Sequence, residues 1–219
     1  MHTTTLALRR PLILLVVVVT AMTTLLAANV SADQAEIGTP EEDCVAHVAD
    51  DCRGQPGNGT LTVVEFDISE DMTRFSFDAD TTHEDGLPAR GSAFITQGYL
   101  YPAGTLNGSN GVLPDGSPEF PELVLGEWTC YGYYVGDGAH TTTGAMVITT
   151  QVFNIGDGIG GETIVTSGYE VADLNVAVAR AITGGTGTYR NARGETSQQM
   201  LGLNATEGVV LRVTLNVQK

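Results

Sequence analysis

The stretch that decides the fold reads Ile182-Thr183-Gly184-Gly185-Thr186-Gly187-Thr188-Tyr189-Arg190-Asn191-Ala192-Arg193-Gly194-Glu195. It lies between an apolar alternating run at 176–182 and a polar alternating run, so it predicts a glycine-rich hairpin between two strands. Glycine-rich loops also bind phosphate, but here no lysine follows and the third glycine of GxGxxG is missing. β-Branched, turn-rich sequence also stands where such a motif needs a helix. We therefore interpret the stretch as a tight strand connection, in which glycine permits close backbone approach.

The rest of the chain from Leu61 onward has the period of β-strands. β-Branched and aromatic residues alternate with polar ones, and Gly, Asn, Asp or Pro separates the runs. We expect eight main strands, near residues 61–68, 91–101, 123–135, 143–155, 161–170, 175–183, 193–202 and 208–217, with 72–79 as an extra edge piece and a long, functional or mobile loop at 102–121. Eight antiparallel strands in one domain predict a closed barrel, which has no exposed edge and an interior able to hold one small ligand.

The N-terminus carries the pattern of a secretory signal peptide. Arg9 and Arg10 precede an apolar run at 12–28, and the small residues of Val30-Ser31-Ala32 follow. We expect cleavage after Ala32, although the run is also long enough for an uncleaved anchor. The expected organisation of this secreted, extracellular protein is a signal peptide at 1–32, an acidic arm at 33–60 and a barrel domain at 61–219.

Acidic residues outnumber basic ones by far. The chain has 10 Lys and Arg against 26 Asp and Glu, a net charge of −16. Loss of Arg9 and Arg10 with the signal peptide leaves 8 basic against 26 acidic residues, a net charge of −18. Such a surface repels nucleic acid and anionic lipid. We therefore expect no nucleic-acid partner and, after signal cleavage, no membrane partner.

Export makes a disulfide an expected feature. The chain has three cysteines, and the short separation of Cys44 from Cys52 favours a bond between these two. Either one pairing with Cys130 is the alternative. No CxxC or HExxH pattern is present, and the stretch 78–86 has the composition of a calcium loop without EF-hand spacing. We therefore expect neither a metal nor a cofactor.

The hairpin stretch resembles the GGTGxFRxARG signature of dirigent proteins and, less closely, the TGGxGxFxGAxG segment of plant allene oxide cyclases. The order of elements is similar too. Val63-Val64-Glu65-Phe66-Asp67 resembles the first-strand Tyr-Glu-Ile-Asn of the cyclases, and Thr129-Cys130 matches a Leu-Cys in their third strand. The resemblance spans 61–217 and implies an antiparallel barrel that binds a small apolar or phenolic ligand. It also implies a homotrimer, since both families trimerise. The apolar face of 209–217 is then either the trimer contact or the filling of the barrel.

Glu65 and Asp67 are the candidate acid–base residues. Alternation places both on one strand face, opposite Val64, Phe66 and Ile68, and the pattern alone is that of solvent-facing carboxylates. The resemblance implies the contrary, because the matching Glu and Asn of the cyclases, and the Asp of the dirigent His-Asp-Ile segment, point into the barrel. A carboxyl group in an apolar lumen has a raised pKa that suits proton transfer. We therefore predict catalytic roles for Asp67 and Glu65.

Arg193 is the third candidate catalytic residue. It shares a strand face with Glu195, and the matching Arg of dirigent proteins lines the cavity, where a guanidinium would stabilise negative charge. A structural Arg that holds the hairpin is the alternative. The expected substrate-binding residues are Glu195 and an aromatic lining, namely Tyr169 with either Tyr131 and Tyr133 or Trp128 and Tyr134, depending on which strand face turns inward.

The chain also departs from both families. Thr186 stands where dirigent proteins have their second Asp, and Ser69-Glu70-Asp71-Met72 replaces the cyclase stretch that holds the catalytic Pro. Two hypotheses follow. The first is a secreted barrel that steers the cyclisation or stereoselective coupling of an apolar or phenolic substrate, as an isomerase-like or dirigent-like enzyme. The second is a non-catalytic binding or surface protein that keeps the barrel as a scaffold.

Overall fold

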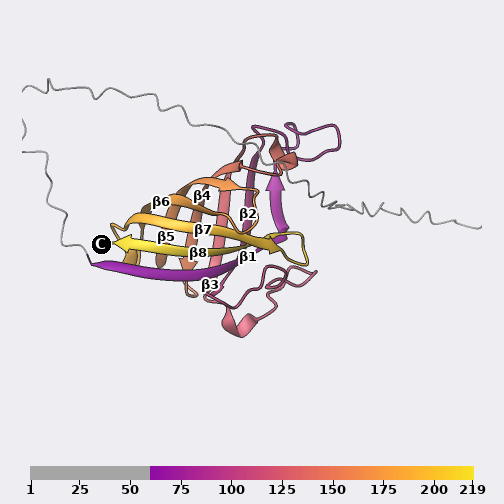
Figure 1. Ribbon diagram of the computed structural model, residues 1–219. Coiled ribbons are helices and arrows are strands. Elements are labelled where there is room, and N and C mark those ends of the chain that lie inside the picture. The colour runs from indigo at the N-terminus through magenta and orange to yellow at the C-terminus, as the bar shows by residue number, and fades with distance from the viewer. Residues whose placement is uncertain (1–59) are drawn as a thin grey trace, which may run out of the picture. The chain divides into compact units, whose positions relative to one another are not determined.

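A computed structural model describes residues 60–219, which form one closed antiparallel barrel (Figure 1). The eight strands follow one another in chain order around the barrel, and β1 pairs with β8 to close it. The strands are β1 Leu61–Phe77, β2 Ala93–Pro102, β3 Gly126–Tyr134, β4 Ala145–Ile155, β5 Glu162–Val171, β6 Ala177–Gly185, β7 Arg193–Leu203 and β8 Val209–Gln218. The prediction of an eight-stranded antiparallel barrel is confirmed.

Helix is scarce in this part of the chain. It comprises three short 3-10 turns, η1 Pro121–Leu123, η2 Gly138–His140 and η3 Gly187–Tyr189. Within residues 60–219, no helix is long and apolar enough to cross a membrane. The predicted signal peptide, the acidic arm and the Cys44–Cys52 disulfide lie outside the described residues, and they stay predictions.

Strand β1 is longer than expected, because the run predicted as a separate edge piece continues it to Phe77. The pairing of β1 with β2 shifts register between Asp71 and Ser76, and β1 bends there. Its last residues therefore rise at the right of Figure 1. Arg74 holds this bend, with its Nε 2.9 Å from Asp71 Oδ2 and its Nη1 3.0 Å from Glu127 Oε1.

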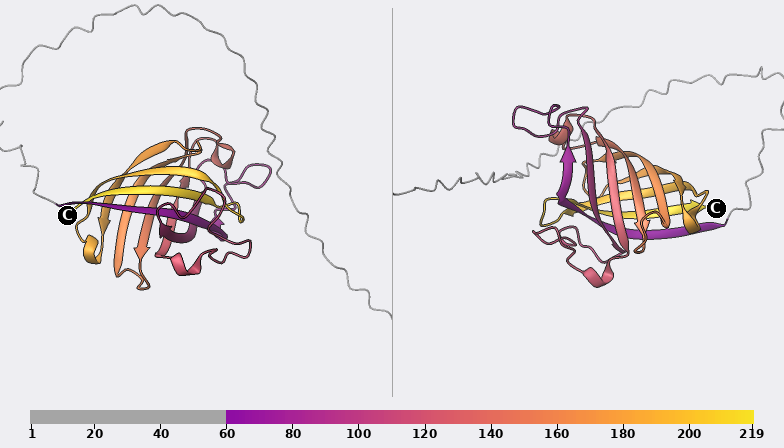
Figure 2. Two further views of the ribbon diagram at one scale, coloured as in Figure 1. Left: turned by 60° about the horizontal axis from the view of Figure 1, so that its bottom comes forward. Right: turned by 180° about the vertical axis from the view of Figure 1, so that it is seen from behind.

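The two ends of the barrel differ in what fills them. The hairpin end, where Gly184–Gly194 connects β6 to β7, is packed with apolar side chains from all around the barrel. These include Phe66, Phe153, Ile164, Ile182, Ala192, Leu215 and Val217. The open end lies opposite, at the β1–β2, β3–β4, β5–β6 and β7–β8 connections. Figure 2 shows the barrel from two further sides. The packing closes the hairpin end to a ligand.

The apolar face of β8 proves to be barrel filling. Leu211, Val213, Leu215 and Val217 belong to the buried core, and Val209 packs against it. The stripe therefore offers no surface for the predicted homotrimer. Trimerisation itself stays a prediction that would need another face of the barrel.

Glycine is required in the hairpin by close backbone approach. A Cβ on Gly185 would meet the carbonyl oxygen of Thr163, and a Cβ on Gly194 would meet that of Asn216. Gly187 adopts a φ of 56°, in the left-handed region. The glycine signature thus serves the folding of the closed end of the barrel.

The residues between β2 and β3, numbered 103–125 and here called the outer loop, fold back over the outside of β1, β2 and β8. Leu106 packs with Tyr101 and Val210 in a second buried cluster. The hydroxyl groups of Tyr99 and Tyr101 donate hydrogen bonds to loop carbonyls at 2.9 and 2.6 Å. The long loop expected from the sequence is therefore a packed outer layer of the barrel.

In the stretch with calcium-loop composition, the carboxylates of Asp78 and Asp85 are engaged by protein groups. Asp78 accepts hydrogen bonds from the Asp80 amide and the Thr81 hydroxyl. The amide of Leu87 lowers the pKa of Asp85, as does His140, whose Nε2 lies 2.8 Å from Asp85 Oδ2. Within the described chain, no group of three or more His, Cys, Asp and Glu side chains is arranged to hold a metal ion.

Candidate functional site

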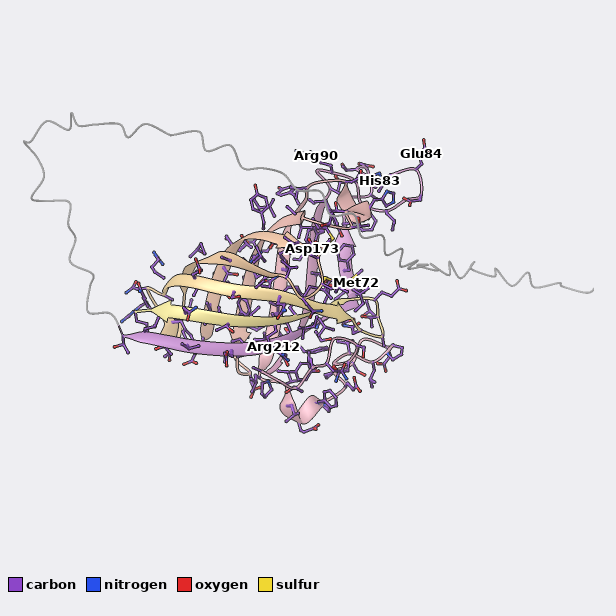
Figure 3. The ribbon with its side chains drawn as sticks, in the orientation of Figure 1. Met72, His83, Glu84, Arg90, Asp173 and Arg212 are labelled. Carbon is purple, nitrogen blue, oxygen red and sulfur yellow. The ribbon has the colours of Figure 1, made fainter. Side chains whose placement is uncertain are left out.

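A cavity of about 150 Å³ occupies the open end of the lumen. Its rim is apolar and includes Met72, Phe75, Met146, Val176 and Met200. Figure 3 labels Met72, which lies where β1 bends at this end of the barrel. These three methionines are the only ones in residues 60–219, and all of them line the cavity. Methionine side chains adapt to ligands of irregular shape.

Deeper in the cavity the lining becomes polar. The side chains of Glu70, Thr96, Cys130, Glu170 and Gln198 reach it from five different strands, and Trp128 and Leu211 complete the wall. A few polar groups at the base of an apolar pocket are the usual arrangement of a small-molecule site, because they fix the orientation of the ligand.

Glu170 is the centre of a buried hydrogen-bonded cluster. Its Oε1 accepts hydrogen bonds from the hydroxyl of Thr149 and the thiol of Cys130, and its Oε2 accepts one from Gln198 Nε2 at 2.8 Å. Arg180 Nη1 lies 3.4 Å from Oε1. In each of these hydrogen bonds Glu170 is the acceptor.

Arg180 is fully buried behind Glu170. Its Nη1 donates to the carbonyls of Gly168 and Tyr169, and its Nη2 donates to Thr149 O and Thr149 Oγ1. The glycine at 168 leaves room for this side chain, since a Cβ there would lie 3.2 Å from the Arg180 Cγ. The guanidinium is therefore fixed by β4 and β5 and acts on the cavity through Glu170.

Glu70 is the second carboxyl group of the cavity and has a different environment. It is buried, and its Oε2 accepts a hydrogen bond from the amide of Val209 at 2.8 Å. Burial raises the pKa of Glu70, and the charge of nearby Glu170 adds to the increase. The two carboxyl groups of the lumen thus have different environments, and burial favours the protonated form of Glu70 over its carboxylate.

Two polar atoms of the cavity lining have no protein partner. They are Trp128 Nε1 and Gln198 Oε1, both buried. Unpaired buried polar atoms are rare and are commonly explained by a ligand or an ordered water. The indole N–H offers one donor and the amide oxygen one acceptor to a bound molecule.

Cys130 is a free thiol in this cavity. Burial raises its pKa well above the ordinary value, and the charge of Glu170 acts in the same direction. The thiol form is therefore favoured over the thiolate that nucleophilic chemistry needs. Tyr134 is likewise kept protonated, because burial raises its pKa to about 12.

The prediction that Asp67 faces the lumen is wrong. Asp67 is buried on the outer face of β1, beneath the outer loop. Its Oδ2 accepts a hydrogen bond from the amide of Leu106 at 2.8 Å, and its Oδ1 lies 2.8 Å from Arg212 Nε. Figure 3 labels Arg212 on this outer side, toward the outer loop. Asp67 holds the loop to the barrel, and Glu65, exposed on the same face, accepts only from Thr214.

We expect Asp67→Ala to lower the free energy of unfolding by about 2 kcal/mol, because hydrogen bonds to a buried charged group are lost. Glu65→Ala, on the same face but exposed, is the matched control and should change it by less than about 0.5 kcal/mol. Urea unfolding followed by circular dichroism measures both. A stable Asp67→Ala variant that no longer binds a ligand in the lumen would restore Asp67 as a site residue.

Arg193 and Glu195 also lie outside the lumen, contrary to expectation. Both are exposed, and Arg193 Nη1 donates to the carbonyls of Thr183 and Ala192 at 2.9 and 2.7 Å. Arg193 thus has the structural role in the hairpin that was the alternative interpretation.

The aromatic candidates divide between the two faces of the sheet. Tyr131, Tyr133 and Tyr169 are exposed on the outside, at 47, 56 and 52%. Trp128 is buried and, with Tyr134, lines the cavity. The inward face of β3 is therefore the one that carries Trp128.

The sequence contained a signal for the residues that were missed. Arg180 occupies the same strand face as Val178 and Ile182, and Glu70 the same face as Phe66 and Ile68. A single charged residue on an otherwise apolar strand face is the mark of a buried polar site, because an unpaired charge cannot be buried there at low cost.

No family model matches the sequence, and no curated protein matches it. Solved structures do match over most of the chain. The pterocarpan synthase dirigent protein PsPTS1 matches with a TM-score of 0.50 and 17% identity, over 73% of this chain and 97% of that chain. The protein described as pyocyanin demethylase gives a TM-score of 0.44 at 13% identity, over 70% of this chain and 100% of that one. The Diels Alderase AbmU from Streptomyces koyangensis gives 0.39 at 13%, over 75% and 70%. The likeness to the dirigent protein shows a shared fold.

Proposed function

We propose that this barrel binds a small, largely apolar molecule in the open end of its lumen and steers the cyclisation or coupling of that molecule. The observation that carries the proposal is the pair of unlike carboxyl groups, Glu70 and Glu170, at the base of an apolar cavity. A protonated acid beside a carboxylate is the arrangement that acid–base chemistry uses.

Each part of the cavity has a role in this proposal. The apolar rim and the wall of Trp128 and Leu211 hold the substrate in one folded conformation, which lowers the entropic cost of ring closure or coupling. Trp128 Nε1 donates a hydrogen bond to a substrate oxygen. Glu70 transfers its proton to the substrate and becomes a carboxylate, and Glu170 accepts the proton that the substrate releases when the new bond has formed. After product release Glu170 gives its proton to solvent and Glu70 takes one up, which restores both groups.

Arg180 is a positioning residue in this scheme. It touches Glu170 and backbone carbonyls, and it does not line the cavity. Its Nη1 lies 3.4 Å from Glu170 Oε1 and holds that side chain in place, so that Glu170 and Glu70 keep different environments during the reaction. Secretion, predicted from residues 1–32, places the activity outside the cell in this proposal.

Native mass spectrometry of the protein purified from its producing culture tests the proposal. We expect a retained small molecule that is released on unfolding. Glu70→Gln should retain this molecule but convert it at least about 100-fold more slowly, the usual contribution of a general acid. The matched control Glu65→Gln, on the outer face, should convert it at the wild-type rate. A Glu70→Gln variant with undiminished conversion would rule out Glu70 as the acid, and a wild-type protein that retains the molecule without converting it would leave the barrel as a non-catalytic binding protein.

A further inference from the structure

The cavity carries ionisable groups of one sign. Glu70, Glu170 and, at the rim, Glu207 line it, whereas no Lys, Arg or His of the described chain does. Arg180 compensates the charge of Glu170 from behind. Glu70 has no basic partner among the ion pairs of residues 60–219. An anionic ligand would therefore meet repulsion, and a cationic ligand would supply the missing partner of Glu70.

Aromatic rings stand beside these carboxyl groups. The ring centroids of Phe75 and Phe94 are 5.8 Å apart, and those of Phe94 and Tyr134 are 5.1 Å apart. All three line the cavity together with Trp128. The faces of aromatic rings attract cations, and several rings around one site are the usual means of binding organic ammonium groups.

Two further features also favour a cationic ligand. Gln198 Oε1 is a buried acceptor without a donor, on a residue that lines the cavity. The net charge of −16 draws cations toward the molecule as a whole. Aromatic rings, an uncompensated carboxyl group and a free acceptor together distinguish this cavity from a purely apolar one.

We propose that the ligand of the lumen is an organic cation, either a protonated amine or an N-alkylated aromatic ring. Its charged nitrogen lies near Glu70 and the aromatic cluster of Phe75, Phe94 and Tyr134, and its apolar body contacts the methionines of the rim. The proposal rests on the proposed function in one respect, since the ligand occupies the same cavity. With a cation bound, Glu70 is its carboxylate partner, so Glu70 acts as the acid only when the bound molecule is neutral.

The protonation of Glu70 makes the affinity for a cationic ligand depend on pH. A neutral amine takes the proton of Glu70, so that ammonium and carboxylate form inside the cavity without exchange with solvent. A permanent cation carries no proton acceptor, and its binding expels the Glu70 proton into solvent. Affinity for a permanent cation must therefore rise with pH, by up to tenfold per unit while free Glu70 is protonated.

Phenyltrimethylammonium and tert-butylbenzene test the proposal, because they have the same shape and differ by one charge. Benzoate serves as the anionic probe. Trp128 is the only tryptophan of the chain and lines the cavity, so its fluorescence reports ligand entry. We expect phenyltrimethylammonium to bind at least about tenfold more tightly than tert-butylbenzene, and benzoate to bind most weakly. The Kd of phenyltrimethylammonium should fall as the pH is raised.

Glu70→Gln should remove both the preference for the cation and the pH dependence, whereas Glu65→Gln on the outer face should keep both. Circular dichroism confirms that each variant is folded. If tert-butylbenzene or benzoate binds as tightly as the cation, the inference is overturned while the lumen remains the ligand site. If none of the three probes binds, the inference and the proposed function both fail.

Discussion

Arg180→Met should lower the free energy of unfolding by roughly 3–5 kcal/mol, because it leaves the charge of Glu170 buried without its partner. The guanidinium is fully buried, and its Nη1 lies 3.4 Å from Glu170 Oε1. The loss also removes the hydrogen bonds to Gly168, Tyr169 and Thr149. Urea unfolding at neutral pH measures the change.

Two further variants separate this ion pair from a general effect of losing an arginine. Arg193→Met, on the outside of the hairpin, should cost less than about 1 kcal/mol, since its exposed side chain bonds only to backbone carbonyls. The double variant Arg180→Met/Glu170→Gln should recover a large part of the loss, because no unpaired charge remains. A double variant as unstable as Arg180→Met alone would contradict the role assigned to Glu170.

Glu70→Gln should change the pH dependence of stability. The pKa of Glu70 is raised in the folded protein, above all by burial. The stability that the protonated carboxyl contributes is therefore fully present below the unfolded pKa of 4.5 and is lost as the pH rises through the folded pKa. A difference of one between the folded and the unfolded pKa corresponds to about 1.4 kcal/mol in the free energy of unfolding.

The difference in the free energy of unfolding between wild type and variant reports on Glu70 alone, because the other acidic groups are the same in both proteins. Urea unfolding of both proteins between pH 4 and pH 9 should show Glu70→Gln gaining stability relative to wild type as the pH rises. The amide cannot ionise, and its oxygen can still accept from Val209. Two parallel curves would show that Glu70 has the same pKa in the folded and unfolded chain.

The barrel itself could be predicted from local sequence. Alternation from Leu61 onward marks each strand, and the glycines of 184–194 mark the connection of β6 to β7. Both signals are local, since strand period and turn geometry depend on neighbouring residues. The continuation of β1 to Phe77 escaped prediction because it depends on a bend held by Arg74 and its partners.

The candidate site could not be predicted in the same way, because alternation does not say which face turns inward. Asp67 and Glu70 stand three residues apart on opposite faces of β1. The outer loop buries Asp67 on the outside, so burial of a carboxyl group there has no relation to the lumen. The resemblance pointed to Arg193 through the glycine signature, which lies at the packed end of the barrel. The open cavity is at the other end.

The cluster around Glu170 depends on residues that are distant in the sequence. Thr149, Arg180 and Gln198 come from three strands and meet only when the barrel closes. The sequence signal was limited to Arg180, a charged side chain on the apolar strand face of Val178 and Ile182, and it becomes informative once the inward face of each strand is known.

The central claim, that the open end of the lumen is the ligand site, is tested most directly by NMR of the methionine methyl groups. Met72, Met146 and Met200 all line the cavity, so ¹³C-methyl labelling places three probes at its rim. On titration with 1-naphthol, a small neutral phenol, all three resonances should shift and saturate with one common Kd. Unchanged methionine resonances, or shifts confined to the amides of 184–194 at the hairpin end, would contradict the account.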